Sequence, residues 1–497
     1  MADKTSLNMY QPTIGMECHV QLNTKTKLFA RVDNDARGAE PNTTVSAICF
    51  GLPGVLPFLN QAAVDLAIRA GLALNAQVNT FSKFDRKHYF YPDLPKGYQI
   101  TQYEQPIIGK GFVDVPIDGK LVKIGIERAH LEEDAGKLTH PGSADYSLVD
   151  LNRAGTPLLE IVSQPDIKSP AIAKAYAREL YLLMKYAGVS DVDLYHGHMR
   201  FDVNISVAKK DSSELGTRAE VKNLNSFKAV EKAAQYEFER QVELLEKGEK
   251  IVQETRGWHD DKQKTFSQRG KEEAHDYRYF PEPDLPPIEI EDKTIKRVQD
   301  YVVVLPKSIR NELASVGVNK EQIENLLDMG VLLEMLLKLI SDDVIQEQRR
   351  THGDKAINTL LVKCANWLAI DVRGLINSGQ ELHPSFAEVH LRELFGQMVT
   401  GHGLSSSAAK TVLLEAAKTG EKIEDIINRL KLHQVSGESE IKALVEQVIT
   451  DNPKATQDFK AGESKALGFL TGQVMKASKG RANPKVVKDI LKKQLEN

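Results

Sequence analysis

The sequence predicts an α+β fold, with a sheet-dominated N-terminal domain followed by all-helical middle and tail domains. Up to about residue 295, short runs of alternating apolar and polar residues are separated by Gly- and Pro-rich turns, a pattern typical of strands. Beyond that point helical spacing dominates. At 497 residues, the chain is also too long for one compact core. We therefore expect domains at 1–295, 296–404 and 405–497, the last being a small helical bundle.

The individual elements of the first domain follow from the same patterns. Alternation predicts strands at 14–22, 199–207 and 217–222, and the last two flank a polar loop and are expected to form a hairpin. Apolar residues at helical spacing predict helices at 171–187 and 228–247.

Composition limits the class of protein. Hydrophobic residues make up 41% of the chain and charged residues 27%, which is ordinary for a soluble globular protein. No apolar run approaches the roughly 18 residues of a membrane helix, and the first residues lack the apolar core of a signal peptide. Cys18, Cys49 and Cys364 form no CxxC pair, which argues against a disulfide framework. We expect a cytoplasmic protein without membrane association, with Cys18 in the core.

Polar side chains gather on one face of each predicted strand. Glu17 and His19 project from the same face of the first strand, about 7 Å apart along it. A polar strand face usually means only exposure to water, but here acids and cations are unusually dense. The polar positions of the hairpin include Arg200, Asp202, Arg218, Glu220 and Lys222.

The segment HLEED at 130–134 adds Glu132 and Glu133 to these acids, and periodicity does not decide which of the two faces inward. Oxygen ligands with one imidazole suit Mg²⁺ or Mn²⁺ better than structural zinc. Such a metal would bridge nucleotide phosphates, while nearby cations would offset charge on a transferred phosphoryl group. The chain has no GxxxxGK[ST], no GxGxxG that opens a helix, no GxSxG and no HExxH. A nucleotide site would therefore not be a P-loop, and no Ser- or Cys-centred hydrolase motif is present.

Two segments suggest contact with nucleic acid. Residues 85–106 interleave aromatic and basic side chains, and Pro92 and Pro95 predict a shaped loop rather than a helix or inner strand. Such a loop suits a single-stranded nucleic-acid end, although its rings can also simply pack on their own domain. Between 476 and 493, seven basic residues face one acid, which predicts either an RNA-backbone contact or a solvated helix face.

Two further patterns favour structural roles. GLPGVLPFLN at 51–60 mixes its glycines with prolines and leucines, which indicates a turn rather than a phosphate-binding loop. His196 and His198 have metal-like spacing, but a turn leading into the hairpin explains them better.

Much of the chain resembles the B-subunit family of the aspartyl/glutamyl-tRNA amidotransferases. The aromatic segment at 85–106 carries this resemblance, and so do seven ordered blocks. These are IGMECHVQL at 14–22, GLPGVLPFLN at 51–60, HLEEDAGKL at 130–138, VDLNRAGTPLLEIVSQPD at 149–166, EVKNLNSF at 220–227, ETRGWHD at 254–260 and DYRYFPEPDLPP at 276–287. The C-terminal part resembles the family's helical tail, with less distinctive motifs.

The resemblance implies an ATP-dependent ligase that forms C–N bonds with glutamine as the amide donor. In the implied reaction, Glu or Asp already esterified to tRNA is activated by ATP to an acyl phosphate. Ammonia then displaces phosphate and gives Gln-tRNA(Gln) or Asn-tRNA(Asn) for translation. The ammonia would come from a separate amidase, the A subunit, and a small C subunit would complete a heterotrimer.

The resemblance also implies roles for individual residues. The metal-facing set, for Mg²⁺ or Mn²⁺, is expected to be Glu17, His19, Glu133 and Glu220. Catalytic roles fall to Glu133, Glu220, Arg200 and Lys222, and nucleotide contacts to Arg218 and the weaker candidate Asp202. The expected tRNA contacts are Arg86, Lys87, Tyr89, Tyr91, Lys96, Lys479, Arg481 and Lys485.

Many family members carry a four-cysteine zinc site around 29–33 and 46–49. Only Cys49 is present there in this chain, so we expect no zinc site and a region held by packing instead.

Two other functions fit the residues. The chain could be a non-catalytic tRNA-binding scaffold, in which case substitution of Glu133 or Glu220 leaves amide formation intact. Acids with a histidine and basic flanks also fit a metal-dependent nuclease, but that function leaves the long aromatic segment unexplained.

Overall fold

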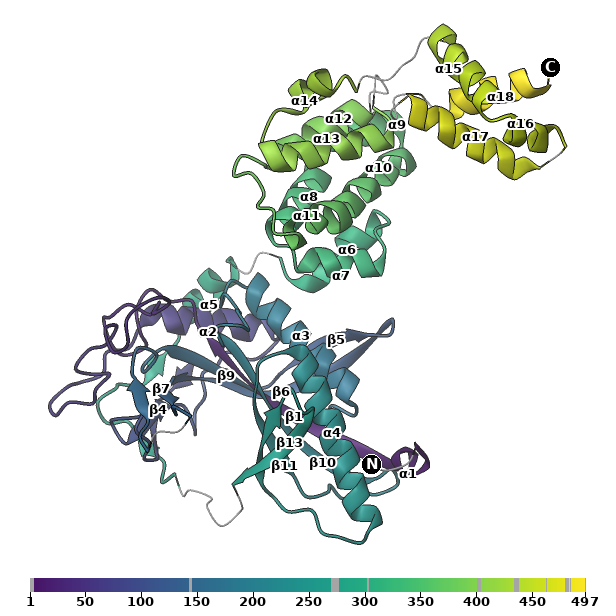
Figure 1. Cartoon of the computed structure of the whole chain (residues 1–497). Coiled ribbons are helices and arrows are strands. Elements are labelled where there is room, and N and C mark those ends of the chain that lie inside the picture. Colours follow the sequence, from purple (N-terminus) through teal and green to yellow (C-terminus); the bar gives the residue numbers. More distant parts are fainter. Residues whose placement is uncertain are drawn as a thin grey trace. The chain divides into compact units, whose positions relative to one another are not determined.

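The computed structural model describes residues 4–142, 145–269, 277–301, 304–399, 404–432, 438–461, 463–478, 482 and 484–496. The chain forms two compact units, residues 1–306 and 307–497. The first carries the main sheet and the second is helical (Figure 1). This confirms the predicted α+β class.

An eight-stranded sheet forms the centre of the first unit. All neighbouring strands are antiparallel except the pair β11 and β12. Their order is β13 (Lys264–Arg269), β12 (Thr255–His259), β11 (Ala219–Leu224), β10 (Met199–Lys209), β1 (Tyr10–Gln21), β9 (Pro157–Ser163), β6 (Lys120–Glu133) and β5 (Gly111–Ile117). The predicted strands and the predicted hairpin of β10 and β11 are confirmed.

Three helices pack against one face of this sheet and bury its apolar side chains. Figure 1 shows two of them, α3 and α4, beside the sheet. They are α2 (Gln61–Ala73), α3 (Pro170–Tyr186) and α4 (Phe227–Glu246). Ser169 and Ser226 accept backbone N–H bonds at the starts of α3 and α4, so each helix begins at an N-cap that satisfies a free donor. Both predicted helices are confirmed within a few residues.

Residues 85–106 differ from the predicted loop. Asp85–His88 (β3) and Tyr98–Thr101 (β4) pair as an antiparallel hairpin, and Phe280–Pro281 (β14) pairs with β3 on its other side. Strand β3 is therefore an inner strand of a small sheet, and the prediction that excluded one was wrong. The prolines lie in the connection between the strands, where their missing N–H groups break no ladder bond.

The remaining elements of the first unit are short. They are α1 (Lys4–Met9), α5 (Asp292–Gln299), β2 (Phe81–Ser82) paired with β15 (Ile288–Glu289), and β7 (Lys137–Thr139) paired with β8 (Leu148–Asp150).

The second unit is built from helices. Its first part contains α6 (Pro306–Ser315), α7 (Lys320–Leu327), α8 (Val331–Ser341), α9 (Asp343–His352), α10 (Asp354–Asn366), a π-helix (Trp367–Val372), α11 (Arg373–Asn377), α12 (Glu388–Val399), α13 (Ser406–Thr419) and α14 (Ile423–Leu430). The last four helices are α15 (Glu438–Asp451), α16 (Pro453–Lys460), α17 (Ser464–Ala477) and α18 (Pro484–Glu496). These four share an apolar core. No helix in the described ranges has the length and apolarity to cross a membrane.

Candidate active site on the polar face of the sheet

Strand β1 crosses the middle of the sheet with one polar and one apolar face. Its burial alternates residue by residue, and the even-numbered residues from 14 to 20 point into the core. Glu17 and His19 therefore share the opposite face, as predicted. The neighbouring strands add residues in register, with Glu160 and Arg200 beside His19 and Asp202 beside Glu17.

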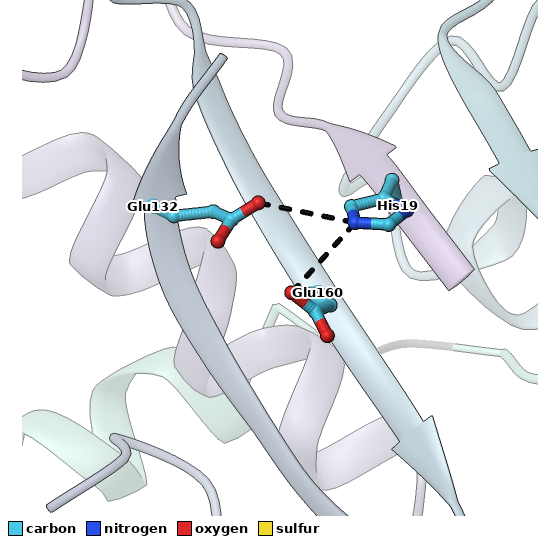
Figure 2. Close-up of side chains that lie close together, drawn as sticks. All are labelled: His19, Glu132 and Glu160. Carbon is cyan, nitrogen blue, oxygen red and sulfur yellow. Dashed lines mark ion pairs between the residues drawn. The ribbon is translucent and has the colours of Figure 1, made fainter. Parts of the chain in front are cut away.

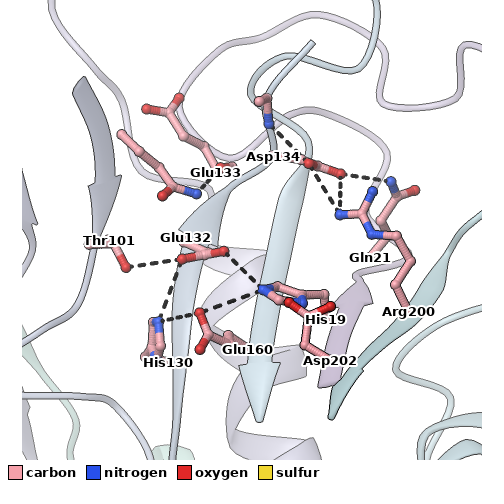
Figure 3. A network of polar contacts seen from close by, with 12 residues as sticks. His19, Gln21, Thr101, His130, Glu132, Glu133, Asp134, Glu160, Arg200 and Asp202 are labelled. Carbon is pink, nitrogen blue, oxygen red and sulfur yellow. Dashed lines mark hydrogen bonds and ion pairs between the residues drawn. The ribbon is translucent and has the colours of Figure 1, made fainter. Parts of the chain in front are cut away.

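The first cluster on this face, the histidine group, consists of His19, His130, Glu132 and Glu160 (Figures 2 and 3). His19 Nε2 lies 3.7 Å from Glu160 and 3.9 Å from Glu132. His130 Nε2 lies 3.3 Å from Glu160 and 3.5 Å from Glu132. His130, Glu160 and His19 are consecutive partners across three strands, so strand register alone brings them together.

Electrostatics in the histidine group favour charged imidazoles. Burial is the largest single influence on His19 and His130 and lowers the pKa of each. The facing carboxylates, chiefly Glu160, together outweigh it and raise both pKa values to about 9. For Glu160, burial raises the pKa, but the two histidines hold it well below its usual range. The group therefore largely neutralises its own charge.

The second cluster, the acid group, consists of Glu17, Asp202 and Glu220. One oxygen from each carboxylate lies within 4.8 Å of the others, the spacing of ligands around a single cation. Asn204 donates to Glu17 at 3.0 Å, and the Lys222 ammonium lies 3.0 Å from Glu220 and 3.5 Å from Asp202.

Asp202 lies beside Glu17 because β10 pairs in register with β1, and the pairing of β10 with β11 is irregular at this point. Asn223 adopts a left-handed conformation with φ +60°, and its backbone N–H donates to Asp202 at 2.8 Å. Asparagine tolerates this conformation better than most residues, so the local sequence suits the irregular pairing.

The acid group keeps an excess of negative charge, because three carboxylates face one lysine. Burial raises the pKa of Glu17, and the carboxylates of Glu160, Glu220 and Asp202 raise it further. Burial lowers the pKa of Lys222, but Asp202 and Glu220 outweigh it and the net shift is upward. Three converging oxygen donors with unbalanced charge form a donor set that suits Mg²⁺ or Mn²⁺.

Arg200 is already paired with a carboxylate. Its guanidinium lies 3.2 Å from Asp134, and Gln21 donates to the same carboxylate at 3.1 Å (Figure 3). Burial raises the pKa of Asp134, but Arg200 and Arg153 outweigh it and bring the pKa below its ordinary value. Arg200 thus holds the end of β6 against β10 and β1 rather than offering a free cation.

The predicted metal-facing set is divided by the structure. Glu17 and Glu220 meet in the acid group, and His19 lies in the histidine group with Glu132. Glu133 points elsewhere: its carboxylate forms an ion pair with Lys96 and accepts the Ile100 N–H at 3.0 Å. The ligand assignment stays a prediction, and Glu132 rather than Glu133 is the glutamate that faces His19.

Aromatic residues form a wall beside the polar face. Tyr103 and Tyr279 stack with ring centroids 4.0 Å apart, and Tyr277 makes edge contacts with Tyr89 and Tyr279. Tyr103 is half exposed and Phe90 is 75% exposed. The wall joins residues 85–106 to residues 277–281, which are far apart in sequence.

The cations of residues 85–106 are largely engaged within the protein. Arg86 pairs with Glu282 at 2.7 Å and lies over the Tyr98 ring. Lys87 lies 4.9 Å from the centre of the Tyr277 ring. Burial lowers the pKa of Lys87, but Glu132 is the chief group that raises it above its ordinary value. Of the predicted tRNA contacts here, Tyr89 and Tyr91 pack edge to face.

In the tail, Lys476, Lys488, Lys492 and Lys493 are exposed. Lys485 lies in α18. Lys479 and Arg481 lie outside the described residues.

A pocket of about 290 Å³ adjoins the acid group. Its lining includes Gly15, Glu17, Val162, Asn204 and Arg218. Arg218 is exposed, and none of the described carboxylates lies within ion-pair distance of it.

Sequence reasoning singled out neither Glu160 nor His130. Glu160 is the one charged residue in the apolar strand PLLEIVS, and a charge in an otherwise buried strand is a signal that could have identified it. His130 precedes the acids of HLEED with the same side-chain alternation as Glu132. Their convergence with His19 depends on strand order, which the sequence pattern does not show.

The structural interpretations of three motifs agree with the structure. Cys18 is fully buried, and His196 lies in a turn with its Nδ1 2.7 Å from Asp193. Residues 51–54 contain turns and residues 55–60 are irregular, and Leu52, Leu56 and Phe58 are more than half exposed. Near Cys49, the buried ammonium of Lys27 donates to the Ala154 carbonyl at 2.7 Å.

Comparisons with known proteins match nearly the whole length of the chain. Residues 12–296 match the GatB/GatE catalytic domain and residues 354–495 the GatB domain. A protein from Dehalococcoides mccartyi strain 195 is 44% identical over 99% of this chain and 100% of its own length. Proteins from Carboxydothermus hydrogenoformans and Persephonella marina are 42% and 44% identical over 98% of this chain and 99% and 100% of their own lengths. All three are named as the B subunit of an aspartyl/glutamyl-tRNA(Asn/Gln) amidotransferase.

The fold, the polar sheet face and these matches define one component of a ligase-type amidotransferase complex. More particularly, the chain belongs to the B-subunit family of the aspartyl/glutamyl-tRNA(Asn/Gln) amidotransferases.

Proposed function

We propose that this chain activates and amidates misacylated tRNA within a complex that also contains an amidase and a small third protein, the A and C subunits. The substrates would be Glu-tRNA(Gln) or Asp-tRNA(Asn), ATP and ammonia. The observation that carries the proposal is the acid group, three buried or half-buried carboxylates converging on the polar face of the family's catalytic domain. We also propose a cytoplasmic location, which the three free, buried cysteines support.

The acid group is the better fit for Mg²⁺. Glu17, Asp202 and Glu220 offer only oxygen donors, which hard divalent cations prefer. The histidine group offers His19, Glu132 and Glu160, a mixed set that Mn²⁺ also accepts once the His19 imidazole has released its proton. A bound Mg²⁺ would supply charge neutralisation for the phosphates of ATP.

The chain's own residues would orient the reacting groups. A carboxylate is a poor electrophile, so its oxygen first takes the γ-phosphoryl group of ATP, releasing ADP and leaving an acyl phosphate. Ammonia then attacks the acyl carbon and phosphate departs. Lys222 and Arg218, at the edges of the acid group and its pocket, are placed to bind phosphate oxygens. The aromatic wall would help to exclude water, which otherwise hydrolyses the acyl phosphate.

For tRNA, the exposed rings of Phe90 and Tyr103 offer stacking surfaces beside the site for an unpaired 3′ end. The exposed lysines of α17 and α18 offer a second, sequence-independent contact with the RNA backbone. Because Arg86 and Lys96 already pair with carboxylates, we assign the acceptor end chiefly to the aromatic residues.

The exposed apolar segment at 51–60 supports a protein partner, since Leu52, Leu56 and Phe58 expose more than half of their surface. The segment packs closely on Lys96, because a Cβ at Gly51 would lie 2.6 Å from the Lys96 side chain. We propose that the amidase covers this segment. Replacing Leu56 with Asp should weaken binding of the amidase, measured by analytical ultracentrifugation, and unchanged assembly would contradict this contact.

The deciding experiment measures amide formation on misacylated tRNA by the reconstituted complex, with ATP, Mg²⁺ and free ammonium instead of glutamine. Ammonium bypasses the amidase, so only activation and amidation are scored. Glu220→Gln should abolish product while tRNA binding is retained, whereas Glu214→Gln, an exposed acid in the loop of the same hairpin, should be active. Full activity of Glu220→Gln would favour the scaffold function instead.

A further inference from the structure

Strand β6 contains a bulge that re-aims one arginine. Ile124 and Ile126 are buried in the core, and without the bulge residue 128 would point the same way. The register shifts between Ile126 and Arg128, so Arg128 pairs with Val162 and shares the polar face with His130. Bulges often re-aim a side chain next to an active site.

Arg128 lies in the same cross-strand row as the acid group. Val162 pairs with Arg128 on one side and with Glu17 on the other, and Glu17 pairs with Asp202. Two strand spacings separate Arg128 from Glu17, roughly 10 Å. An arginine side chain spans most of that distance, so a ligand above Val162 would be reachable from Arg128 and from the acid group together.

Arg128 has no anionic partner within the described part of the chain, although its side chain is half buried. Its Nε is buried and has no hydrogen-bond acceptor. By contrast, Arg200 pairs with Asp134. A buried guanidinium nitrogen without an acceptor is costly, and an anion bound beside it would remove that cost.

The pocket beside Glu17 provides the space for such an anion. It holds about 290 Å³, and Val162 and Arg218 are among its lining residues. Arg128 does not line the pocket itself, but it pairs with Val162 between β6 and β9 and so lies next to it. Guanidinium groups match phosphate oxygens in a bidentate geometry, so one arginine in the pocket lining and a second beside Val162 suit a chain of linked phosphates.

We propose that the polyphosphate of ATP lies over Val162, with Arg128 binding it from the β6 side and Arg218 from the β11 side. This assignment rests on the proposed function and adds to it a position for the phosphates and a binding residue, Arg128.

Binding of inorganic tripolyphosphate to the full-length protein in the presence of Mg²⁺, measured by calorimetry, tests the proposal. Arg128→Gln should weaken binding at least tenfold, and Arg128→Lys, which keeps the charge but not the fork, should recover part of the loss. Lys123→Gln is the matched control, because Lys123 lies on the same strand, is 61% exposed and pairs with Asp114. It should bind as the unmodified protein does.

Thermal unfolding separates a binding role from a structural one. Without ligand, Arg128→Gln should melt at the same temperature as the unmodified protein or higher, because the buried Nε of Arg128 donates no hydrogen bond that the substitution would remove. The upward shift that tripolyphosphate produces in the unmodified protein should be largely lost. A lower melting temperature without ligand, combined with an unchanged shift, would overturn the proposal.

Equal tripolyphosphate affinity for Arg128→Gln and the unmodified protein would also overturn the proposal. The proposed function would survive that result if the complex with Arg128→Gln still amidates misacylated tRNA in an ATP-dependent reaction. If the unmodified complex binds neither ATP nor tripolyphosphate, the proposed function and this assignment both fail.

Discussion

The two clusters on the polar face contain similar acids but differ in how their charge is balanced. In the histidine group, Glu132 and Glu160 face two imidazoles whose pKa values are raised to about 9. In the acid group, three carboxylates lie around one ammonium, that of Lys222, and the pKa of Glu17 is raised instead. We expect the first arrangement to stabilise the fold without any ligand, and a bound cation would relieve the repulsion within the second. Similar residues on one sheet face are therefore expected to affect the stability of the ligand-free protein in opposite directions.

The largest expected effect is on catalysis through the acid group. Glu17→Gln removes one of three converging oxygen donors, and we expect ATP-dependent activation to fall about 100- to 1,000-fold. The measurement is ADP release from ATP by the reconstituted complex with misacylated tRNA. Near-normal ADP release would remove the acid group from the chemistry and break the contrast between the two clusters.

A smaller effect is expected on stability through the histidine group. Glu160→Gln leaves His19 and His130 without their principal carboxylate in a buried setting, which should cost about 3 kcal/mol of the free energy of unfolding. Urea unfolding in EDTA measures this. Glu214→Gln, at an exposed position, serves as the control. If Glu160→Gln lowers the free energy of unfolding no more than Glu214→Gln does, the histidine group does not stabilise the fold.

In the acid group, a substitution is expected to raise rather than lower the free energy of unfolding in EDTA. Glu17→Gln removes mutual repulsion among carboxylates, so the metal-free protein should become more stable, by up to about 1 kcal/mol. Added Mg²⁺ should then stabilise the unmodified protein more than the variant. A clear loss of stability in EDTA would mean that Glu17 is a structural residue like Glu160.

The smallest expected effect is the pH dependence of the stability that Glu17→Gln adds to the metal-free protein. Because the pKa of Glu17 is raised in the folded state, the folded protein binds its proton more tightly than the unfolded chain does. The resulting stability is fully present below the ordinary pKa of glutamate and is lost as pH rises through the raised value. In EDTA, Glu17→Gln and the unmodified protein should therefore be equally stable at low pH. The variant should become the more stable of the two as pH rises. A difference that is constant with pH would assign it to packing rather than charge.

The sequence by itself determined the local features of this protein. Alternation along β1 was enough to place Glu17 and His19 on one face, and the polar loop between β10 and β11 was enough to predict their hairpin. Helical spacing located α3 and α4, and the seven family blocks identified the family. These features depend on residues close together in the chain or on recognisable strings, so a pattern can reveal them.

Only the tertiary structure decided which distant residues meet. Strand order places Glu160 of β9 between His130 and His19, and it separates Glu133, held by Lys96, from the cluster that the sequence had suggested for it. The inner position of β3 depends on β14, nearly two hundred residues later in the chain. A bulge turned Arg128 toward the polar face of the sheet, and simple alternation along the strand does not predict such a bulge. Such contacts arise from register and strand order, and these are set by packing across the whole sheet rather than by any local stretch of sequence.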